Sequence, residues 1–346
     1  PSGRVFPVDL LSLSRYCLSM HMFPIPPVIQ RFAKRFTNSG FSLYIVGGAV
    51  RDHLLGKRCE DYDFTTDALP EQVISLFRQV IPTGIDHGTV TVHFEKQSFE
   101  VTTFRSEGDY LDGRHPSSVT YVRNLAEDLK RRDFTINAFA VDCSDGSIID
   151  LNGGMEDLKK RTIRAIGEPE QRFGEDALRM LRACRIAAKL DFTIEEQTLK
   201  AITHLKHTLA KVSAERIREE LFKLIGSSHP DKGLQYLRIT GMLEIILPEL
   251  AKGEGILQGV MHHEDVLSHN ISTLLACATL TDSIEVRFAA LLHDIGKSEV
   301  VEPGEDRNTF YRHELVGEKL TKTIMKRLKA SNEQSKTVCH LVRHPM

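Results

Sequence analysis

Short runs of alternating or β-branched residues dominate the chain from Phe41 to about Val141. A period of two is typical of strands with one buried face, and we expect strands at residues 41–46, 61–65, 89–94, 98–104 and 134–141. Helical patterns lie between them at 48–55 and 70–80. The pattern predicts an α+β fold, with a small mixed or antiparallel sheet in this part of the chain.

The pattern changes after residues 150–154, because apolar residues then recur at helical spacing, as in 178–188. A second break falls at 253–255, and the helical pattern resumes at Val266. The organisation that we expect is a leader at 1–30 without an assigned role, a head domain at 31–152, a helical region at 153–252, and a further helical domain at 253–346. The sequence stops inside a helical pattern, so we expect this last domain to be truncated.

Composition narrows the classes of protein. The chain is 41% apolar and 27% charged, which is typical of a globular protein. Its 45 Lys and Arg against 47 Asp and Glu give a net charge of −2, so contact with a nucleic acid would need local basic patches such as 159–161 and 216–218. The 6 cysteines form no C-x-x-C pair, and we expect them to be reduced. No apolar run reaches about 18 residues, and we expect a cytoplasmic protein.

Two adjacent glycines, Gly47 and Gly48, occur where an apolar strand meets a helix. Backbone N–H groups at such a turn can approach a phosphate closely. A tight strand-to-helix turn without any ligand would give the same pattern, so the glycines alone do not decide between the two interpretations.

The sequence Asp61-Tyr62-Asp63 places two carboxylates on one face of a strand. Two like charges so close are unfavourable unless a cation lies between them, and Mg²⁺ held by carboxylates and substrate phosphates is the chemistry of polymerases. Glu100 offers a third carboxylate, which an antiparallel partner strand would bring to the same metals. The alternative for Glu100 is an ordinary solvent-facing side chain.

Four motifs in order resemble the class II tRNA nucleotidyltransferases and bacterial poly(A) polymerases, within the DNA polymerase β superfamily. They are residues 47–52 (Gly-Gly-Ala-Val-Arg-Asp), 61–63, 100–105 (Glu-Val-Thr-Thr-Phe-Arg) and 131–138 (Arg-Arg-Asp-Phe-Thr-Ile-Asn-Ala). The resemblance covers residues 40–230 approximately. It implies template-independent transfer of nucleoside monophosphates from CTP and ATP to the 3′ end of RNA.

The resemblance also implies roles for individual residues. Asp61 and Asp63 would hold two Mg²⁺ ions, with Glu100 completing the catalytic set. The implied nucleotide-binding residues are Gly47, Gly48 and Arg51 along the triphosphate, and Arg132, Asp133 and Asn137 around phosphate and ribose. Without the other motifs, the preferred interpretations would be a solvated basic pair for Arg131 and Arg132 and a capping or turn residue for Asn137.

Residues 174–179 match the E-D-x-x-R motif of the same family. Helical spacing would put Asp176 and Arg179 on one face, with Glu175 orienting Arg179 and with Arg182 and Arg185 continuing a basic stripe toward phosphate or packed carboxylates. The alternative is an intrahelical ion pair on a solvated face.

Hydrogen-bond polarity explains how Asp176 and Arg179 could select a base. Cytosine and adenine each present an amino donor beside a ring-nitrogen acceptor, which a carboxylate acceptor and a guanidinium donor complement. Uracil and guanine present the reverse order, and each group left unpaired costs about 1–3 kcal/mol. The pair could therefore reject UTP and GTP without a nucleic-acid template.

The polar segment 109–116 contains Gly and Pro and predicts a mobile loop between strands. In the family, a loop here with the D-G-R pattern, carried in this sequence by Asp112 and Arg114, helps to switch the pocket from C to A. A plain surface loop is the alternative.

Residues 291–297 (Leu-Leu-His-Asp-Ile-Gly-Lys) resemble the HD superfamily of metal-dependent phosphohydrolases. Candidate ligands of a divalent metal are His269, His293 and Asp294, with His263 and His313 nearby in the sequence. The usual pattern closes with a later Asp, and Asp306 comes too soon after Asp294 for that position. Hydrolysis of terminal or cyclic phosphates is therefore a hypothesis.

The leading interpretation is addition of CMP, CMP and AMP to the 3′ end of tRNA from CTP and ATP, with Mg²⁺, and without a membrane or an obligate protein partner. The nearest rival is a poly(A) polymerase or an A-adding tRNA nucleotidyltransferase, whose head motifs are almost the same. An interpretation of another class is a non-catalytic RNA-binding or nucleotide-sensing module, or a protein that is an HD phosphohydrolase only.

Overall fold

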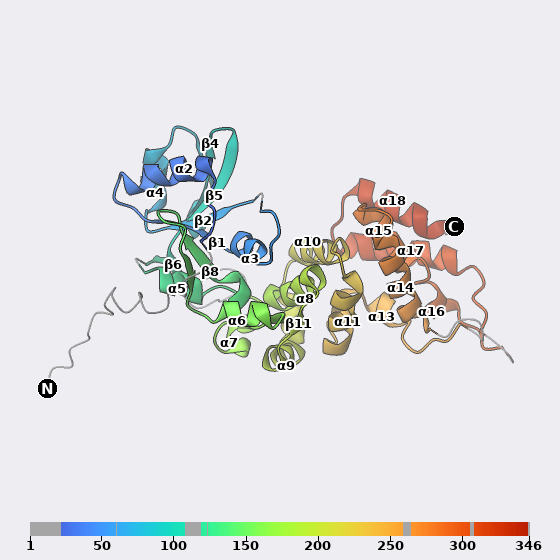
Figure 1. Ribbon diagram of the computed structural model, residues 1–346. Coiled ribbons are helices and arrows are strands. Elements are labelled where there is room, and N and C mark those ends of the chain that lie inside the picture. Colours follow the sequence, from blue (N-terminus) through green and yellow to red (C-terminus); the bar gives the residue numbers. More distant parts are fainter. Residues whose placement is uncertain are drawn as a thin grey trace. The chain divides into compact units, whose positions relative to one another are not determined.

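The computed structural model describes residues 22–59, 61–107, 119–122, 124–258, 264–304 and 308–344. They form two compact units (Figure 1). The head unit comprises the described residues up to Lys160 together with Arg164–Gly167, and the helical unit comprises Arg161–Ile163 and the described residues from Glu168 onward. The helical unit contains most of the two predicted helical domains, 153–252 and 253–346, without dividing them. The predicted division of the chain into three domains after the leader therefore remains a prediction.

A seven-stranded sheet forms the centre of the head unit, with the strand order β3-β4-β5-β2-β1-β8-β9. The strands are β1 (Leu43–Val46), β2 (Asp63–Thr66), β3 (Val80–Gly84), β4 (Thr89–Phe94), β5 (Gln97–Thr103), β8 (Phe139–Asp142) and β9 (Ile148–Asp150). The short strands β6 (Arg105–Glu107) and β7 (Val119–Tyr121) pair separately. The helices are α2 (Pro27–Thr37), α3 (Gly48–Leu54), α4 (Pro70–Leu76), α5 (Leu125–Lys130) and α6 (Gly154–Lys159). The predicted α+β fold with a mixed sheet is confirmed.

Strand pairing brings the motifs together at one end of the central strands. β1 pairs antiparallel with both β2 and β8, so that Val46 at the end of β1 lies opposite Asp63 and Ala140. β2 and β5 are parallel, with Asp63 opposite Glu100. The expectation of an antiparallel partner for this carboxylate was therefore wrong, although the register still brings Glu100 beside Asp63. The connection through α4, β3 and β4 makes the parallel order possible.

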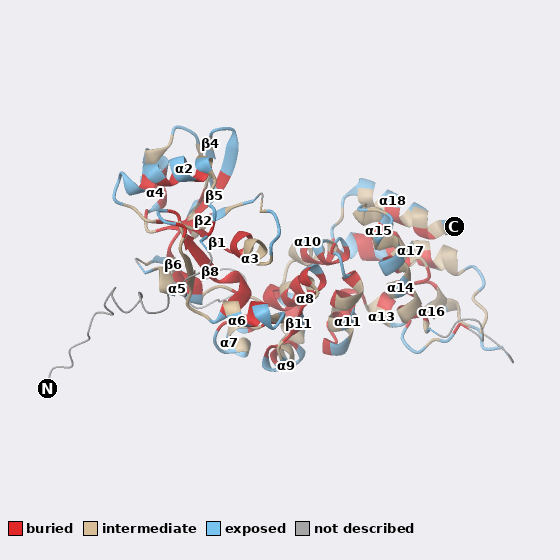
Figure 2. Ribbon diagram, viewed as in Figure 1, coloured by how far each residue is buried: buried red, intermediate tan, exposed pale blue. Residues whose placement is uncertain are grey.

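Aromatic packing fixes α2 on the sheet. Phe32 of α2 is fully buried, and its ring centroid lies 5.3 Å from that of Phe64 and 4.8 Å from that of Phe99. Figure 2 shows buried residues in the central strands of the head unit. Because Phe64 and Phe99 point into this core, the residues next to them in sequence, Asp63 and Glu100, point to the opposite face.

The alternating pattern predicts one strand over residues 134–141, but the structure does not contain it. Thr135–Asn137 form a 3₁₀ turn, and only Phe139–Asp142 belong to the sheet. The backbone of the first half pairs elsewhere, because Thr135 N donates to Arg164 O and Ile166 N donates to Asp133 O. The turn places Asn137 among the polar residues described below. Similarly, the helix predicted at 70–80 ends at Leu76, because Val80 and Ile81 pair with β4.

The helical unit contains twelve described α-helices: α7 (Pro169–Glu175), α8 (Leu178–Leu190), α9 (Glu196–Leu205), α10 (Ala214–Ile225), α11 (Pro230–Thr240), α12 (Leu243–Ile246), α13 (Pro248–Ala251), α14 (Val266–Ala278), α15 (Ile284–Leu292), α16 (Lys297–Val300), α17 (His313–Arg327) and α18 (Asn332–Arg343). Helix α8 is buried on nearly every side and packs against α10 and α11. Among the described residues, no helix combines the length and apolarity required to cross a membrane.

Arg287 of α15 ties three helices of this unit together. Its side chain is buried, and its guanidinium donates to the carbonyls of Ile225 and Ser227 at the C-terminal end of α10 and of Ala278 and Thr281 at the C-terminal end of α14, at 2.7–3.3 Å. These carbonyls have no partner within their own helices, so one cation satisfies several groups that burial would otherwise penalise. The arrangement holds the end of α10 against α15.

Candidate active site and HD cluster

The two glycines form the turn between β1 and α3. Gly47 has φ +75°, a conformation that L side chains rarely adopt. A Cβ at this position would lie 3.7 Å from both Arg132 Nη1 and Asp63 Oδ2. The backbone of Gly47 thus lies between a guanidinium and a carboxylate that are far apart in sequence, and the absence of a side chain leaves room beside both.

Three carboxylates face the same side of the sheet. Asp63 is the first residue of β2 and Asp61 lies two residues before it; both are exposed, whereas Phe64 is buried and Tyr62 is half-buried. The alternation predicted from the sequence is therefore present, although the strand begins only at Asp63. Glu100 is also exposed and lies opposite Asp63 in the register.

Electrostatics indicate that this cluster favours a cation. The pKa of Asp63 is raised, first by partial loss of hydration and then by the neighbouring charges of Asp61 and Glu100, while Arg132 acts in the opposite direction. Carboxylate oxygens are the ligands that Mg²⁺ prefers, so the donor set fits a divalent ion. A bound divalent ion would relieve the repulsion among the three groups.

Three further predicted residues form one buried hydrogen-bonded chain. Arg51 Nη1 donates to Asn137 Oδ1 at 2.5 Å, and Asn137 Nδ2 donates to Asp133 Oδ1 at 3.1 Å. Arg51 also donates through Nε to Asp52 Oδ1 at 2.8 Å. Because all of these atoms have partners, the chain holds Arg51 and Asn137 rigidly beside the glycine turn. The Arg51 guanidinium itself lies close to Gly48, where a Cβ would be 3.2 Å from Nη2.

Asp128 of α5 is a supporting residue that the sequence analysis missed. It is fully buried and binds Arg131 at 2.7 Å and Arg132 at 3.3 Å. Burial raises the pKa of Asp128, but the charges and hydrogen bonds of the two arginines outweigh it and lower the pKa overall. The spacing of three and four residues on a helix was a signal that could have identified this anchor of Arg132.

The predicted selecting pair does not lie on one helix. Asp176 has φ −144° and ψ 105° and occupies the break between α7 and α8, whereas Arg179 belongs to α8. Instead of pairing with each other, Asp176 binds Arg216 at 2.7 Å and Arg179 binds Glu175 at 2.5 Å. The contact between Glu175 and Arg179 agrees with the orienting role predicted for Glu175.

The basic stripe on α8 faces a packed carboxylate. Arg185 Nε donates to Glu220 Oε2 at 2.5 Å, and Arg182 lies 3.8 Å from the other oxygen of the same buried glutamate. The basic runs suggested for RNA contact are also engaged internally: Arg161 pairs with Asp191, and Arg218 donates to the carbonyls of Leu328 and Lys329. The loop residues Asp112 and Arg114 lie outside the described residues.

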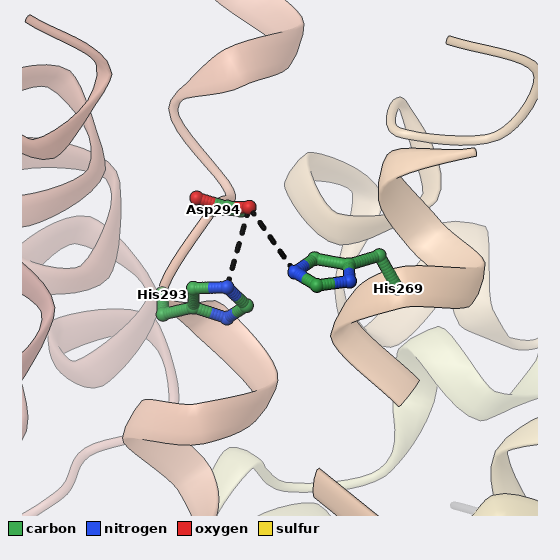
Figure 3. Close-up of side chains that lie close together, drawn as sticks. All are labelled: His269, His293 and Asp294. Atoms are coloured by element: carbon green, nitrogen blue, oxygen red, sulfur yellow. Dashed lines mark ion pairs between the residues drawn. The ribbon is translucent and has the colours of Figure 1, made fainter. Parts of the chain in front are cut away.

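The HD residues converge in the helical unit (Figure 3). Nε2 of His293 lies 3.2 Å and Nε2 of His269 lies 3.6 Å from Asp294 Oδ2, and one ligand atom from each of the three residues lies within 4.8 Å of the others. His313 Nε2 approaches the second oxygen, Oδ1, at 3.2 Å. The hydrogen bond to Asp294 raises the pKa of His313. Two imidazoles and a carboxylate fit a divalent transition metal. The candidate His263 lies outside the described residues, as does Asp306, which the spacing had already excluded.

Lys297 is a member of this cluster that the sequence analysis did not single out. Its ammonium donates to Asp294 Oδ2 at 2.5 Å and to Gln258 Oε1 at 2.6 Å, and lies 5.3 Å from the centre of the Phe310 ring. Burial acts against ionisation of Asp294, but hydrogen bonds from His293, His313 and Lys297 outweigh it and keep its pKa well below the ordinary value. The lysine thus already places a positive charge on the carboxylate oxygen that the two histidines share.

Substitution of Gly296 by Ala is expected to destabilise the helical unit by about 3 kcal/mol, because overpacking against rigid backbone is costly. The new Cβ would lie 2.1 Å from His313 O and 2.6 Å from Gly317 N, and neither atom can move without shifting α17. Thermal unfolding measures the loss. Gly174→Ala is the matched control: no atom lies within 4 Å of its Cβ position, so this variant should be at least as stable as the wild type. Equal stability of the two variants would contradict the prediction.

Comparison with known protein families places three domain types along the chain. Residues 43–164 match the poly A polymerase head domain, residues 191–253 match the probable RNA and SrmB-binding site of polymerase A, and residues 266–345 match the HD domain. The head-domain match contains the glycine turn, all three carboxylates and the Arg51 network. The HD match contains His269, His293 and Asp294.

Curated proteins with similar sequences carry the name CCA-adding enzyme. The protein of Levilactobacillus brevis is 50% identical over 216 residues, which are 62% of this chain and 53% of that protein. The protein of Oceanobacillus iheyensis is 46% identical over 245 residues, which are 71% of this chain and 61% of that protein. The chain therefore spans about half to three fifths of the length of these relatives.

Solved structures agree over more of the chain. The structure of the Bacillus stearothermophilus CCA-adding enzyme in complex with CTP is 32% identical, with a TM-score of 0.64, and the match covers 92% of this chain and 78% of that one. The Thermotoga maritima CCA-adding enzyme complexed with tRNA is 20% identical, with a TM-score of 0.63, which shows a shared fold.

Proposed function

Because the chain belongs to the family of the CCA-adding enzymes, we propose that it adds nucleotides without a template to the 3′ end of tRNA, using CTP and ATP to complete the CCA sequence. The observation that carries the proposal is the convergence of Asp63 and Arg132 on Gly47, with Glu100 paired to Asp63 in the register. In this arrangement the carboxylates of Asp63 and Glu100 can bind a metal ion. The guanidinium of Arg132 and the backbone of Gly47 can bind a phosphate group. The proposed enzyme acts in the cytoplasm and does not require a membrane.

The proposed division of labour in the head unit follows from the contacts. Asp61, Asp63 and Glu100 would hold two Mg²⁺ ions, which supply charge neutralisation at the triphosphate and activation of the RNA 3′-hydroxyl when bound. Arg132 would bind phosphate oxygens while Asp128 keeps its side chain in place. The backbone of Gly47 and Gly48 would allow the triphosphate to approach closely.

Arg51, Asp133 and Asn137 would act together in binding phosphate and ribose. Their shared hydrogen bonds restrict each side chain to one orientation before the nucleotide arrives, which lowers the entropy lost on binding. A preference for ribonucleotides requires a polar contact to the 2′-hydroxyl, and this group of residues is the proposed source. In the helical unit, Asp176 and Arg179 would read the base, with Asp176 accepting from its amino group and Arg179 donating to its ring nitrogen.

An incorporation assay tests the proposal and separates it from its rivals. The chain is incubated with Mg²⁺ and tRNA that lacks the terminal CCA, with each nucleoside triphosphate supplied alone and then with CTP and ATP together. Incorporation of two CMP followed by one AMP is expected. Long A tails without C would instead indicate a poly(A) polymerase, and AMP added only to tRNA ending in CC would indicate an A-adding enzyme. Absence of any incorporation would contradict the proposal.

We also propose that the HD cluster holds a divalent metal on His269, His293 and Asp294, and that it serves hydrolysis of phosphate esters. The compact arrangement of two imidazoles and one buried carboxylate supports this proposal. When bound, the metal would supply activation of water for attack on the ester. Metal content after dialysis against Mn²⁺ or Ni²⁺, compared between the wild type and His293→Ala, tests the site directly.

Replacement of Lys297 by Met is expected to raise the affinity of the HD cluster for Mn²⁺ or Ni²⁺ by about tenfold or more. The lysine ammonium and a metal would compete for Asp294 Oδ2, and two like charges about 4 Å apart repel by about 1–4 kcal/mol per unit charge in surroundings of high to intermediate dielectric constant. Isothermal titration calorimetry measures the change. Lys252→Met is the control, because this exposed lysine pairs with Glu299 instead. Unchanged affinity in Lys297→Met would contradict the competition.

A further inference from the structure

We propose that Phe23 is a positioning residue for catalysis, which holds Asp61 in the place where it binds metal by packing against the neighbouring Tyr62. The inference rests on the proposed function, in which Asp61 and Asp63 are metal ligands. It concerns residues 22–26, a segment ahead of α2 that contains no charged side chain. Phe23 acts on the carboxylate through the tyrosine that separates the two aspartates.

The two aspartates are held in different ways. Asp63 is the first residue of β2, and it lies opposite Val46 of β1 and Glu100 of β5 in the paired register. Strands on both sides therefore fix its backbone. Asp61 lies outside this register, which begins at Asp63. The direction of the Asp61 carboxylate consequently depends on what holds the residues around it.

The residues on either side of Asp61 are bonded to each other. Tyr62 Oη donates to Cys59 O at 3.3 Å, which ties the side chain that follows Asp61 to the backbone that precedes it. Cys59 Sγ donates to Ala49 O, in the first turn of α3, at 2.8 Å. A thiol is a weak donor, so this bond attaches the segment only loosely at its start. The place of the Tyr62 ring then decides the course of the backbone at Asp61.

The Phe23 ring fixes the place of the Tyr62 ring. The two rings are nearly perpendicular, at 83°, with their centroids 6.5 Å apart. Such edge-to-face pairs are favourable beyond the area that they bury. Phe23 is only 4% exposed, and its ring also lies 4.5 Å from that of His53 on α3. Phe23 thus packs against both the helix that follows the glycine turn and the tyrosine between the aspartates.

The backbone of Phe23 is itself held by the turn between β8 and β9. Phe23 N donates to Gly146 O at 2.9 Å. Gly146 has φ +80°, and a Cβ at this position would lie 2.8 Å from Phe23 O, so the close approach requires glycine. Because β8 pairs with β1 and β1 pairs with β2, the support for Phe23 belongs to the same sheet as Asp63. The sheet therefore holds Asp63 directly and Asp61 through Phe23.

The first measurement is the Mg²⁺ concentration that gives half-maximal CMP incorporation on tRNA lacking CCA, in the wild type, Phe23→Ala and Phe23→Leu. This concentration is expected to rise at least about tenfold in Phe23→Ala, because a ligand that must first be ordered binds metal more weakly. The rate at saturating Mg²⁺ should change less than about threefold. Phe23→Leu, which retains a large apolar side chain, should show a smaller rise.

Amide hydrogen exchange, measured without nucleotide or Mg²⁺, reports the same change independently of activity. The peptide that contains Asp61 and Tyr62 is expected to exchange at least about threefold faster in Phe23→Ala than in the wild type. A peptide from β5, which the sheet holds on both sides, should exchange at the wild-type rate.

Phe36→Leu is the matched control for Phe23→Leu. Phe36 is a buried residue of the same core, but its ring lies against those of Phe32 and Phe77. The control should lower the unfolding temperature and keep the wild-type Mg²⁺ requirement, which separates positioning of Asp61 from a general loss of stability.

An unchanged Mg²⁺ requirement or unchanged exchange at Asp61 in Phe23→Ala would overturn the inference and leave the proposed function in place. An equal rise of the Mg²⁺ requirement in Phe36→Leu and Phe23→Leu would do the same. Wild-type chain that incorporates no nucleotide would overturn the proposed function, and the inference with it. If Phe23→Ala does not fold, Phe23→Leu decides: a Mg²⁺ requirement at least about twofold above that of Phe36→Leu would support the inference, and a smaller difference would overturn it.

Discussion

Nucleotide incorporation is expected to fall about a thousandfold or more in Asp61→Asn and in Asp63→Asn, a loss of ~4 kcal/mol in transition-state stabilisation. An amide is a much poorer ligand for Mg²⁺ than a carboxylate, and each substitution removes one negative charge from the set of three. The glycine turn, the Arg51 network and the sheet should persist, because both side chains are exposed and neither belongs to the aromatic core.

The same substitution at Asp63 is expected to leave the free energy of unfolding unchanged or to raise it. The pKa of Asp63 is raised in the folded chain, so the ionised carboxylate disfavours the folded state above that pKa, and this cost disappears as the pH falls through it. Asparagine removes the charge at every pH. A group that weakens the fold and is required for activity is typical of a functional site.

Primer extension on tRNA and thermal unfolding at pH 7 check both parts. Glu95→Gln is the control, since Glu95 is an exposed carboxylate in the β4–β5 turn of the same sheet and pairs with Arg31. It should keep full activity. Mg²⁺ should stabilise the wild type more than Asp63→Asn. Normal incorporation by either Asn variant at Asp61 or Asp63 would refute the assignment of the catalytic carboxylates.

Replacement of Asp176 by Asn is expected to lower the CMP-to-UMP selectivity by about a hundredfold. The wild-type carboxylate offers only acceptors, so the uracil carbonyl would face a like group and remain unpaired, at about 1–3 kcal/mol. An amide offers a donor as well, and can therefore pair with that carbonyl. Incorporation of CMP should fall at the same time, because a charge-assisted hydrogen bond is lost.

Competition between CTP and UTP on tRNA lacking CCA measures this selectivity. Asp191→Asn is the control, since Asp191 follows the other end of α8 and binds Lys232 and Arg161. Its selectivity should equal that of the wild type. If Asp176→Asn still excluded UTP as strictly as the wild type, Asp176 would not be the acceptor that reads the base.

Local signals in the sequence predicted much of the head unit. The alternation around Phe64 placed Asp61 and Asp63 on the exposed face, and the strand at 89–94 was predicted with the bounds that the structure shows. Local signals failed where distant backbone competes for hydrogen bonds. Residues 134–138 alternate as a strand does, but their backbone pairs with residues 164–166, which a periodicity of neighbouring residues does not reveal.

In the HD cluster, too, the sequence revealed the local motif but not the contacts with distant segments. Adjacent His293 and Asp294 are visible as a motif, and His269 was a reasonable candidate on the preceding segment. Lys297 was visible in the same motif, but its occupation of Asp294 Oδ2 depends on Gln258 and Phe310, which lie on other segments. The sequence therefore predicted the ligands and not the competing charge.

The amino-acid sequence by itself determined the chemical groups and their local faces: glycines without a Cβ at a turn, carboxylates at a period of two, and a His-Asp dyad in an apolar helical context. These depend on the backbone geometry of a few neighbouring residues. Tertiary structure alone decided that β2 and β5 run parallel, that Asp176 leaves the helix to meet Arg216, and that Asp128 anchors Arg132. Such partners are chosen by the packing of whole strands and helices, in which burial makes an unpaired charge costly and so selects whichever opposite charge the fold brings near.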